Sequence, residues 1–253
     1  MGYIENPKTR GSGIICCIPQ TGLCPNRCED CFFQGGRSYL EPLDMNLPNM
    51  PSSDEAEGRV VRVNDGNDSN VQRSLVIEAV QIYPDRFYNT AIPRDIKDFD
   101  APVVLTVNPG KMTDSDFYQV DPIPPNLMFV RVRTNMWNLD NLVRPAIQYY
   151  SARHVPVILT FMAYHSLQPE FGAKPKEGSC TYGDYYTYRK RTTNSYYAIK
   201  SDAWQSVMAN YLFNRWVYSC GTEGENGYSG CRYCGNCLRE YFNTRERMRS
   251  QSK

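Results

Sequence analysis

Seven of the ten cysteines in this chain gather in two short groups. The N-terminal group is Cys24, Cys28 and Cys31, and the C-terminal group is Cys220, Cys231, Cys234 and Cys237. Cysteines two or three residues apart are poorly placed to bridge each other, but their thiolates can bind one metal centre. Disulfides are also rare in reducing compartments. The spacing therefore predicts two metal-binding sites.

The N-terminal group has C-x3-C-x2-C spacing, in the run Cys24-Pro25-Asn26-Arg27-Cys28-Glu29-Asp30-Cys31. Three thiolates can hold three irons of a cubane iron–sulfur cluster and leave the fourth iron open to a small molecule. The group follows an apolar segment, residues 13–19, that we expect to be a strand. Active sites of α/β folds lie where strands end. A zinc knuckle and a set of structural thiols are the alternatives.

This segment resembles the signature of the radical SAM superfamily, whose C-x3-C-x2-C loop follows the first strand of a partial (β/α)6 barrel. The resemblance implies a [4Fe–4S] cluster on Cys24, Cys28 and Cys31, with S-adenosylmethionine (SAM) bound at the open iron. Reductive cleavage of SAM would give a 5′-deoxyadenosyl radical that abstracts a substrate hydrogen. The resemblance also implies an electron donor such as flavodoxin or ferredoxin.

One departure from the superfamily pattern concerns the adenine of SAM. Many members have an aromatic residue just before the last cysteine, where this chain has Asp30. Phe32 or Phe33 could replace that aromatic residue, since some activating enzymes of the superfamily place Phe after the cysteine. We therefore expect the adenine contact at Phe33.

A polar turn follows the second strand candidate, with the sequence Gly66-Asn67-Asp68-Ser69. Its placement is similar to that of the Gly-Gly-Glu-like motif that receives the amino group of SAM in the superfamily. Gly66 would allow a close backbone approach, and Asp68 would offer a carboxylate to the ammonium. A plain turn after a strand is the alternative.

Further polar residues follow the fourth and fifth strand candidates. By position, the resemblance implies that Asn108, Arg133 and Asn135 hydrogen-bond the ribose hydroxyls and the carboxylate of SAM. A guanidinium suits this role because it can bind both carboxylate oxygens. Arg131 and Arg133 lie on the same face of the expected strand, so either could point inward. Solvated strand ends are the alternative.

The C-terminal cysteines supply four thiolates, enough to complete a metal centre. Their C-x2-C-x2-C part, Cys231 to Cys237, is similar to ferredoxin-type loops, whereas zinc ribbons usually pair two C-x2-C knuckles. Many radical SAM enzymes carry an auxiliary cluster after the barrel, and this group resembles a shorter version of such a cysteine pattern. We expect a second [4Fe–4S] cluster or a structural zinc. Cys180 could face the substrate, serve as a ligand or be an ordinary thiol.

Six apolar segments must position these groups. They are residues 13–19, 59–64, 86–92, 102–107, 127–133 and 155–161. Helix-like or turn-like stretches separate them, and helices are expected at 74–83, 138–153 and about 202–218. Continuous apolar runs between helices indicate an α/β fold with a parallel sheet. Six such units predict a partial (β/α)6 barrel, because a closed barrel needs eight.

The expected organisation is a radical SAM core at residues 1–165, a tyrosine-rich insertion at 166–200 and a metal-binding extension at 201–253. Tyrosines in the insertion alternate with Arg and Lys, a pattern that can stack bases, grip a peptide or cover the barrel mouth. His154 is expected to be structural, whereas His165 could face the active site. The substrate is then a nucleotide or nucleic-acid base, or alternatively a peptide or protein. A non-catalytic iron–sulfur or zinc protein is the third possibility.

The composition is that of an ordinary globular protein, with 41% hydrophobic and 22% charged residues among 253. The formal net charge of +1 provides no overall field that would attract nucleic acid or a membrane surface. No apolar stretch approaches the roughly 20 residues of a membrane span, and the N-terminus lacks signal-peptide features. We therefore expect a cytoplasmic protein with no membrane partner.

Overall fold

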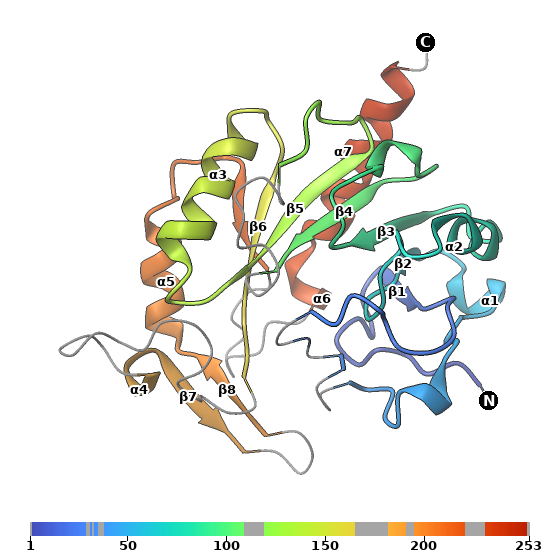
Figure 1. Cartoon of the computed structure of the whole chain (residues 1–253), viewed down its shortest axis with the longest axis horizontal. Coiled ribbons are helices and arrows are strands. Elements are labelled where there is room, and N and C mark those ends of the chain that lie inside the picture. The colour runs from blue at the N-terminus through green and yellow to red at the C-terminus, as the bar shows by residue number, and fades with distance from the viewer. Residues whose placement is uncertain are drawn as a thin grey trace.

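The computed structural model describes residues 2–28, 31, 33–34, 38–108, 119–164, 182–190, 195–220 and 231–251. Its centre is a seven-stranded sheet in the order β1-β2-β3-β4-β5-β6-β9, and each neighbouring pair of strands is parallel (Figure 1). The strands are β1 (Ile14–Cys17), β2 (Val60–Val63), β3 (Arg86–Thr90), β4 (Val103–Val107), β5 (Leu127–Thr134), β6 (Val157–Phe161) and β9 (Val217–Ser219). The predicted α/β class and parallel sheet are confirmed.

Six of these strands lie in the six apolar segments that the sequence indicated, because a sheet covered on both faces needs apolar side chains at nearly every position. The seventh strand, β9, was not predicted. It falls within the helix expected at about 202–218, and that expectation is wrong beyond Ala209, where α5 (Ser201–Ala209) ends. Leu212 and Phe213 gave this region apolar spacing, yet both are exposed in the turn after the helix. The sheet therefore takes a strand from beyond residue 165.

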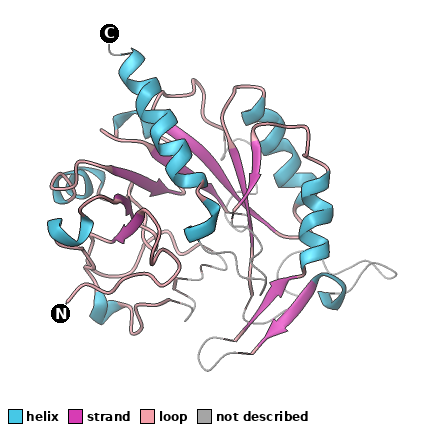
Figure 2. Cartoon of the chain, turned by 180° about the vertical axis from the view of Figure 1, so that it is seen from behind, coloured by secondary structure: helices cyan, strands magenta, loops and turns pink. Residues whose placement is uncertain are grey.

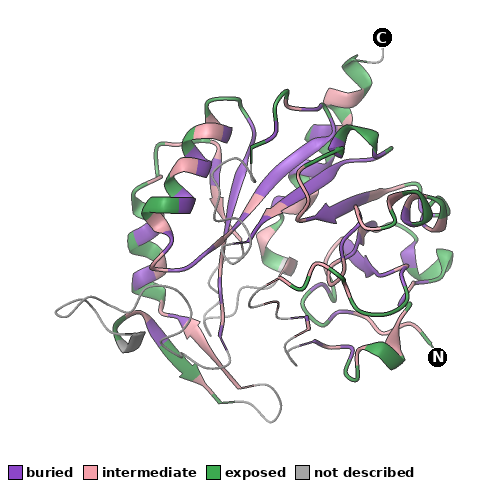
Figure 3. Ribbon diagram, viewed as in Figure 1, coloured by how far each residue is buried: buried purple, intermediate pink, exposed green. Residues whose placement is uncertain are grey.

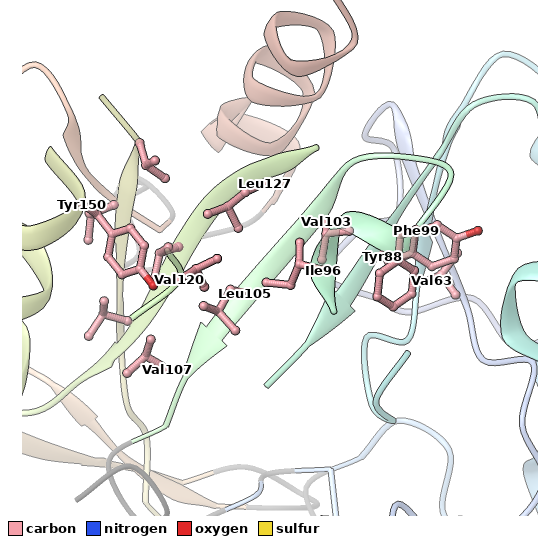
Figure 4. Close-up of a cluster of buried hydrophobic side chains, with 14 of the residues drawn as sticks. Val63, Tyr88, Ile96, Phe99, Val103, Leu105, Val107, Val120, Leu127 and Tyr150 are labelled. Carbon is pink, nitrogen blue, oxygen red and sulfur yellow. The ribbon is translucent and has the colours of Figure 1, made fainter. Parts of the chain in front are cut away.

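One face of the sheet is covered by α2 (Arg73–Ala79), α3 (Arg144–Ser151) and α5. Strand residues such as Leu105, Val130 and Leu159 pack there against Ile147 of α3 and Val207 of α5. Figure 4 shows part of this core, and Figure 3 shows that the strands are mostly buried while the outward sides of the helices are exposed. The helices expected at 74–83 and 138–153 thus correspond to α2 and α3, the latter preceded by a π-helical turn at Leu139–Val143.

The opposite face of the sheet is covered by the C-terminal helix α7 (Asn236–Gln251), which crosses it in Figure 2. Tyr241 packs against Phe87, with ring centroids 6.3 Å apart. Its hydroxyl donates to Asp85 at 3.0 Å, and Arg245 also contacts Asp85. Arg247 donates to the Leu127 carbonyl at 2.6 Å. These contacts make α7 an integral layer of the fold.

A small antiparallel hairpin stands apart from the main sheet (Figure 1). It consists of β7 (Tyr186–Arg189) and β8 (Tyr196–Ile199), with α4 (Tyr182–Tyr185) before it and α5 after it. Tyr186 stacks on Trp137 at 5.6 Å, and Tyr164 bridges to Tyr197 through backbone hydrogen bonds. Cys180 and His165 lie outside the described residues.

The remaining described elements are short. They are a 3-10 turn at Asp44–Asn46, α1 (Ser53–Ala56), a 3-10 turn at Ile96–Asp98 and α6 (Cys231–Cys234). Ser52 begins α1 with a capping box, because its hydroxyl accepts from the Glu55 backbone and the Glu55 side chain accepts from the Ser52 backbone. Among the described residues, no helix has the length and apolar character that crossing a membrane requires.

Candidate metal centres

The N-terminal cysteines lie in the loop that follows β1. All three side chains are partly exposed, and the Cys31 backbone amide donates to the Cys28 carbonyl at 3.2 Å. Burial, together with the nearby Asp68, Cys28 and Cys31, raises the pKa of Cys24 to about 11, against an opposing backbone hydrogen bond at Asn26. The thiols are therefore close enough to influence one another, as ligands of one cluster must be.

Two residues inside this loop anchor it to the turn after β2. The Asn26 side chain donates to Asp68 Oδ2 at 2.8 Å. The buried ring of Phe33 lies so close to Gly66 that a Cβ atom there would be only 2.1 Å from it. Residue 66 must therefore be glycine for Phe33 to pack as it does. The sequence predicted that Gly66 allows SAM to approach the backbone; in the structure the Phe33 ring packs against Gly66.

Asp68 makes hydrogen bonds both to the cysteine loop and to the end of β3. Its side chain accepts hydrogen bonds from Asn26, from the Thr90 hydroxyl at 2.7 Å and from the backbone amides of Asn70 and Ala91 at 2.8 and 2.7 Å. The residue is only 3% exposed, and burial raises its pKa while these hydrogen bonds lower it. Both carboxylate oxygens are taken by internal donors. Asp68 thus ties the cysteine loop to the ends of β2 and β3.

Two further residues of the same turn also make internal contacts. The Asn67 side chain accepts from the Asp68 backbone at 2.9 Å. Ser69 is fully buried, and its hydroxyl accepts from Asn64 at 3.1 Å. These contacts hold the shape of the turn that the sequence placed near the SAM ammonium.

The residues expected near the ribose and carboxylate of SAM lie at the ends of β4 and β5. Asn108 is buried directly after β4. Arg133 is partly exposed near the end of β5. The Asn135 side chain closes the next turn, because its oxygen accepts from the backbone amides of Trp137 and Asn138 and its nitrogen donates to Tyr164. Asn135 therefore shapes the end of β5.

The C-terminal cysteines come together from three elements. Cys220 follows β9 and its amide donates to the Leu159 carbonyl at 2.7 Å, Cys231 and Cys234 lie on α6, and Cys237 lies in the first turn of α7. Burial, together with the nearby Cys220 and Cys231, raises the pKa of Cys237 to about 12, against the opposing charges of Arg131 and Arg62. Burial likewise raises the pKa of Cys220, with added contributions from Cys231 and Cys234. The four thiols thus form one group.

This group faces a row of polar side chains on the sheet. Side chains two residues apart on a strand share a face. Each strand from β1 to β6 contributes a side chain to the apolar layer under α7. The side chain two positions further along the same strand lies on the same face, and these six residues are Cys16, Arg62, Asn89, Thr106, Arg131 and Thr160. Arg131 donates to Asn89 at 3.3 Å and Thr106 at 3.5 Å, and it lies over the Phe129 ring at 5.7 Å. Arg131 opposes the effect of burial on the pKa of both Cys220 and Cys237.

Arg62 is the second cation of the row. It donates to Cys16 Sγ at 3.2 Å and pairs with Asp65 at 3.4 Å. Its Nε is buried and has no hydrogen-bond partner among the described residues. A thiolate-bound centre is anionic, and buried charge requires nearby counter-charge and donors. Two guanidinium groups and an unsatisfied donor fit such a centre on the C-terminal cysteines.

The N-terminal group also fits the cofactor that the sequence implies. It offers three thiols on one partly exposed loop, and none of the nine described cysteines is in a disulfide. Over the described ranges, no three His, Cys, Asp or Glu side chains converge as ligands of a single metal ion. A cubane cluster distributes its thiolates over separate iron corners, so it does not require such convergence.

Sequence reasoning did not assign Arg62, Asn89 and Thr106, and it left open which arginine of β5 points inward. Their signal is the alternation along each strand, where a polar residue follows an apolar one on the same face. The alternation indicates a site only when it is known that α7 and the C-terminal cysteines cover this face of the sheet. No protein-family model, curated protein or solved structure matches the chain.

Proposed function

We propose that this protein is a radical SAM enzyme. The observation that carries the proposal is the loop after β1, where Cys24, Cys28 and Cys31 lie together and partly exposed, without disulfides. The loop is fixed by Asn26 and Phe33 to the turn after β2. This is the place and the ligand set that a SAM-binding [4Fe–4S] cluster needs.

The strand order supports the proposal further. Each strand is paired with the next strand along the sheet without a reversal, from β1 to β6 and then β9. A doubly wound sheet reverses its order at a switch point, whereas a barrel adds each strand to the same edge. We therefore propose a partial (β/α)6 barrel with β9 as an additional strand. The face beneath α7 and the C-terminal cysteines would be its inner face.

In the proposed reaction, a bound [4Fe–4S] cluster with SAM supplies the 5′-deoxyadenosyl radical that removes a hydrogen atom from the substrate. Cys24, Cys28 and Cys31 would hold the cluster. Asp68 keeps their loop in place through Asn26, so we assign it a positioning role. Arg133 and Asn108, at the same edge of the sheet, are the candidates for binding the polar groups of SAM.

For the substrate we propose a nucleotide or nucleic-acid base. Tyr188 on β7 is 54% exposed and pairs with Tyr197 at 5.1 Å, close in sequence to Arg189 and Lys190. Exposed aromatic rings beside cations can stack bases and hold phosphates. Incubation with deuterated nucleosides or deuterated peptides distinguishes the two substrate classes, because the true substrate passes deuterium to 5′-deoxyadenosine. Transfer from a peptide alone would refute the nucleotide assignment.

The proposal is tested by electron paramagnetic resonance of the anaerobically reconstituted, reduced protein. Addition of SAM should change the signal of the N-terminal cluster in the wild type, since SAM binds its open iron. Cys24→Ala should lack this response, and Leu23→Ala, which alters an exposed neighbour, should keep it. An iron–sulfur signal that is indifferent to SAM in the wild type would favour a non-catalytic binding protein.

A further inference from the structure

The two cysteine groups have opposite electrostatic surroundings. Asp68 lies against the N-terminal cysteine loop, where it accepts a hydrogen bond at 2.8 Å from Asn26, between Cys24 and Cys28. Arg131 lies over the Phe129 ring at 5.7 Å, and Cys220 and Cys237 pack against the same apolar layer. The contrast follows from the sheet, because β5 directs Arg131 toward the C-terminal group while the turn after β2 directs Asp68 toward the N-terminal loop.

Arg131 is also a cation whose charge is not offset nearby. In the part of the chain that the structure describes, it forms no ion pair with Asp or Glu, and its hydrogen bonds go to the neutral side chains of Asn89 and Thr106. Arg62, by contrast, is paired with Asp65 at 3.4 Å. The uncompensated positive charge beside the C-terminal cysteines is therefore that of Arg131.

An iron–sulfur centre becomes more negative by one charge when it is reduced. A fixed cation in a low-dielectric environment stabilises the reduced form, whereas a fixed anion destabilises it. Cys220 and Cys237 pack beside the apolar layer formed by Phe87, Phe129 and Ile158, so water screens the interaction poorly. Residues around the ligands commonly set the properties of a metal centre in this way.

We propose that Arg131 is a positioning residue that raises the reduction potential of a [4Fe–4S] centre on Cys220, Cys231, Cys234 and Cys237 above that of the N-terminal cluster. This inference rests on the proposed second centre. The two centres would then have different tasks. The C-terminal centre takes up the first electron, and the N-terminal cluster is a strong reductant once it has been reduced. Arg131 acts through the cysteines and need not touch substrate.

The test is a reductive titration of the reconstituted protein, with each centre followed by electron paramagnetic resonance. Signals are assigned with Cys24→Ala, which retains only the C-terminal centre. In the wild type, the C-terminal centre should be reduced first. Arg131→Gln should shift its midpoint potential to a more negative value and leave the N-terminal cluster unchanged, whereas Arg131→Lys should retain most of the wild-type potential.

Arg153→Gln is the matched control, because it removes an exposed guanidinium that lies over Tyr149 of α3, on the face of the sheet opposite to α7. It should shift neither potential. Reduction of the N-terminal cluster first in the wild type, an unchanged potential in Arg131→Gln, or zinc on the C-terminal cysteines would each overturn the inference. The titration needs no SAM. Loss of SAM cleavage with an intact Arg131 effect would therefore refute the proposed function and leave this inference standing.

Discussion

At the scale of single residues, the contact between Phe33 and Gly66 links the cysteine loop to the turn after β2. The sequence indicated both residues for contact with SAM, and the structure brings them together against each other. Composition and spacing could not reveal this, because the contact joins residues that are far apart in the chain. Asp68 is similar: its carboxylate was noticed, but its four internal donors come from three separate segments.

Gly66→Ala should destabilise the protein by about 1–3 kcal/mol, the usual cost of overpacking a closely packed site. The added methyl group would meet the Phe33 ring, so we also expect weaker iron binding at the N-terminal group. Urea unfolding and iron analysis measure the two effects. The double variant Gly66→Ala/Phe33→Ala should recover part of the iron binding, and Gly2→Ala, which adds a methyl group in open space, should have no effect. Full stability of Gly66→Ala would contradict the packing.

At the scale of elements, strands β1 to β6 of the main sheet were predictable because each is a continuous apolar run bounded by turn residues. β9 was not, since three residues are too few to show a period. The role of α7 was also missed. Its sequence is strongly polar, and only a few of its side chains, Tyr241 above all, are fully buried against the sheet.

Tyr241→Ala should cost about 3–5 kcal/mol of stability, as is typical for loss of a buried aromatic side chain. Because α7 begins at the residue before Cys237, the variant should also lose metal from the C-terminal group before the N-terminal group. The neighbouring Phe242 is 55% exposed and provides the control, since Phe242→Ala should change neither property. Thermal unfolding and metal analysis of both variants decide the matter. Equal effects of the two substitutions would refute the packing of α7.

The N-terminal segment is held to β1 and β2 by an ion pair between Glu5 and Arg59, with an N–O distance of 2.5 Å. The hydrogen bond from Arg59 lowers the pKa of Glu5 below its usual 4.5, although burial opposes this. A lowered pKa in the folded state adds stability above the usual value, and that stability is lost as the pH falls through the folded-state pKa.

Glu5→Gln should therefore lower stability by up to about 1 kcal/mol at pH 7, and its difference from the wild type should shrink in acid. Urea unfolding at a series of pH values measures this. Glu57→Gln, at an exposed glutamate, should show no such pH-dependent difference. A difference between Glu5→Gln and the wild type that grows in acid would have the wrong sign for this ion pair.

At the scale of the whole molecule, the sheet positions two cysteine groups, one near each end of the chain: the first follows β1, and the second lies after β9 and on α6 and α7. The N-terminal group is read from local spacing alone, so the sequence was sufficient to propose it. The position of the C-terminal group on the sheet, facing Arg131 and Arg62, depends on β9 and α7 and could not be read from spacing. The sequence therefore indicated both cysteine groups and missed the surroundings of the second.

Because the two groups use separate ligands, they should lose metal independently. The wild type should bind about eight irons per chain, from two clusters of four. Cys24→Ala and Cys237→Ala should each retain about four, and their spectra should belong to different clusters. Iron and zinc analysis with Mössbauer spectroscopy provides the measurement. Loss of all iron from either single variant would show that the two groups do not form independent centres.

The most direct test of the central claim is the formation of 5′-deoxyadenosine from SAM by the reduced, reconstituted protein. The wild type should form it, and Cys24→Ala, Cys28→Ala and Cys31→Ala should not, although their C-terminal centre remains loaded. Full iron loading of the wild type with no 5′-deoxyadenosine, in the presence of dithionite and SAM, would refute the proposed radical SAM activity.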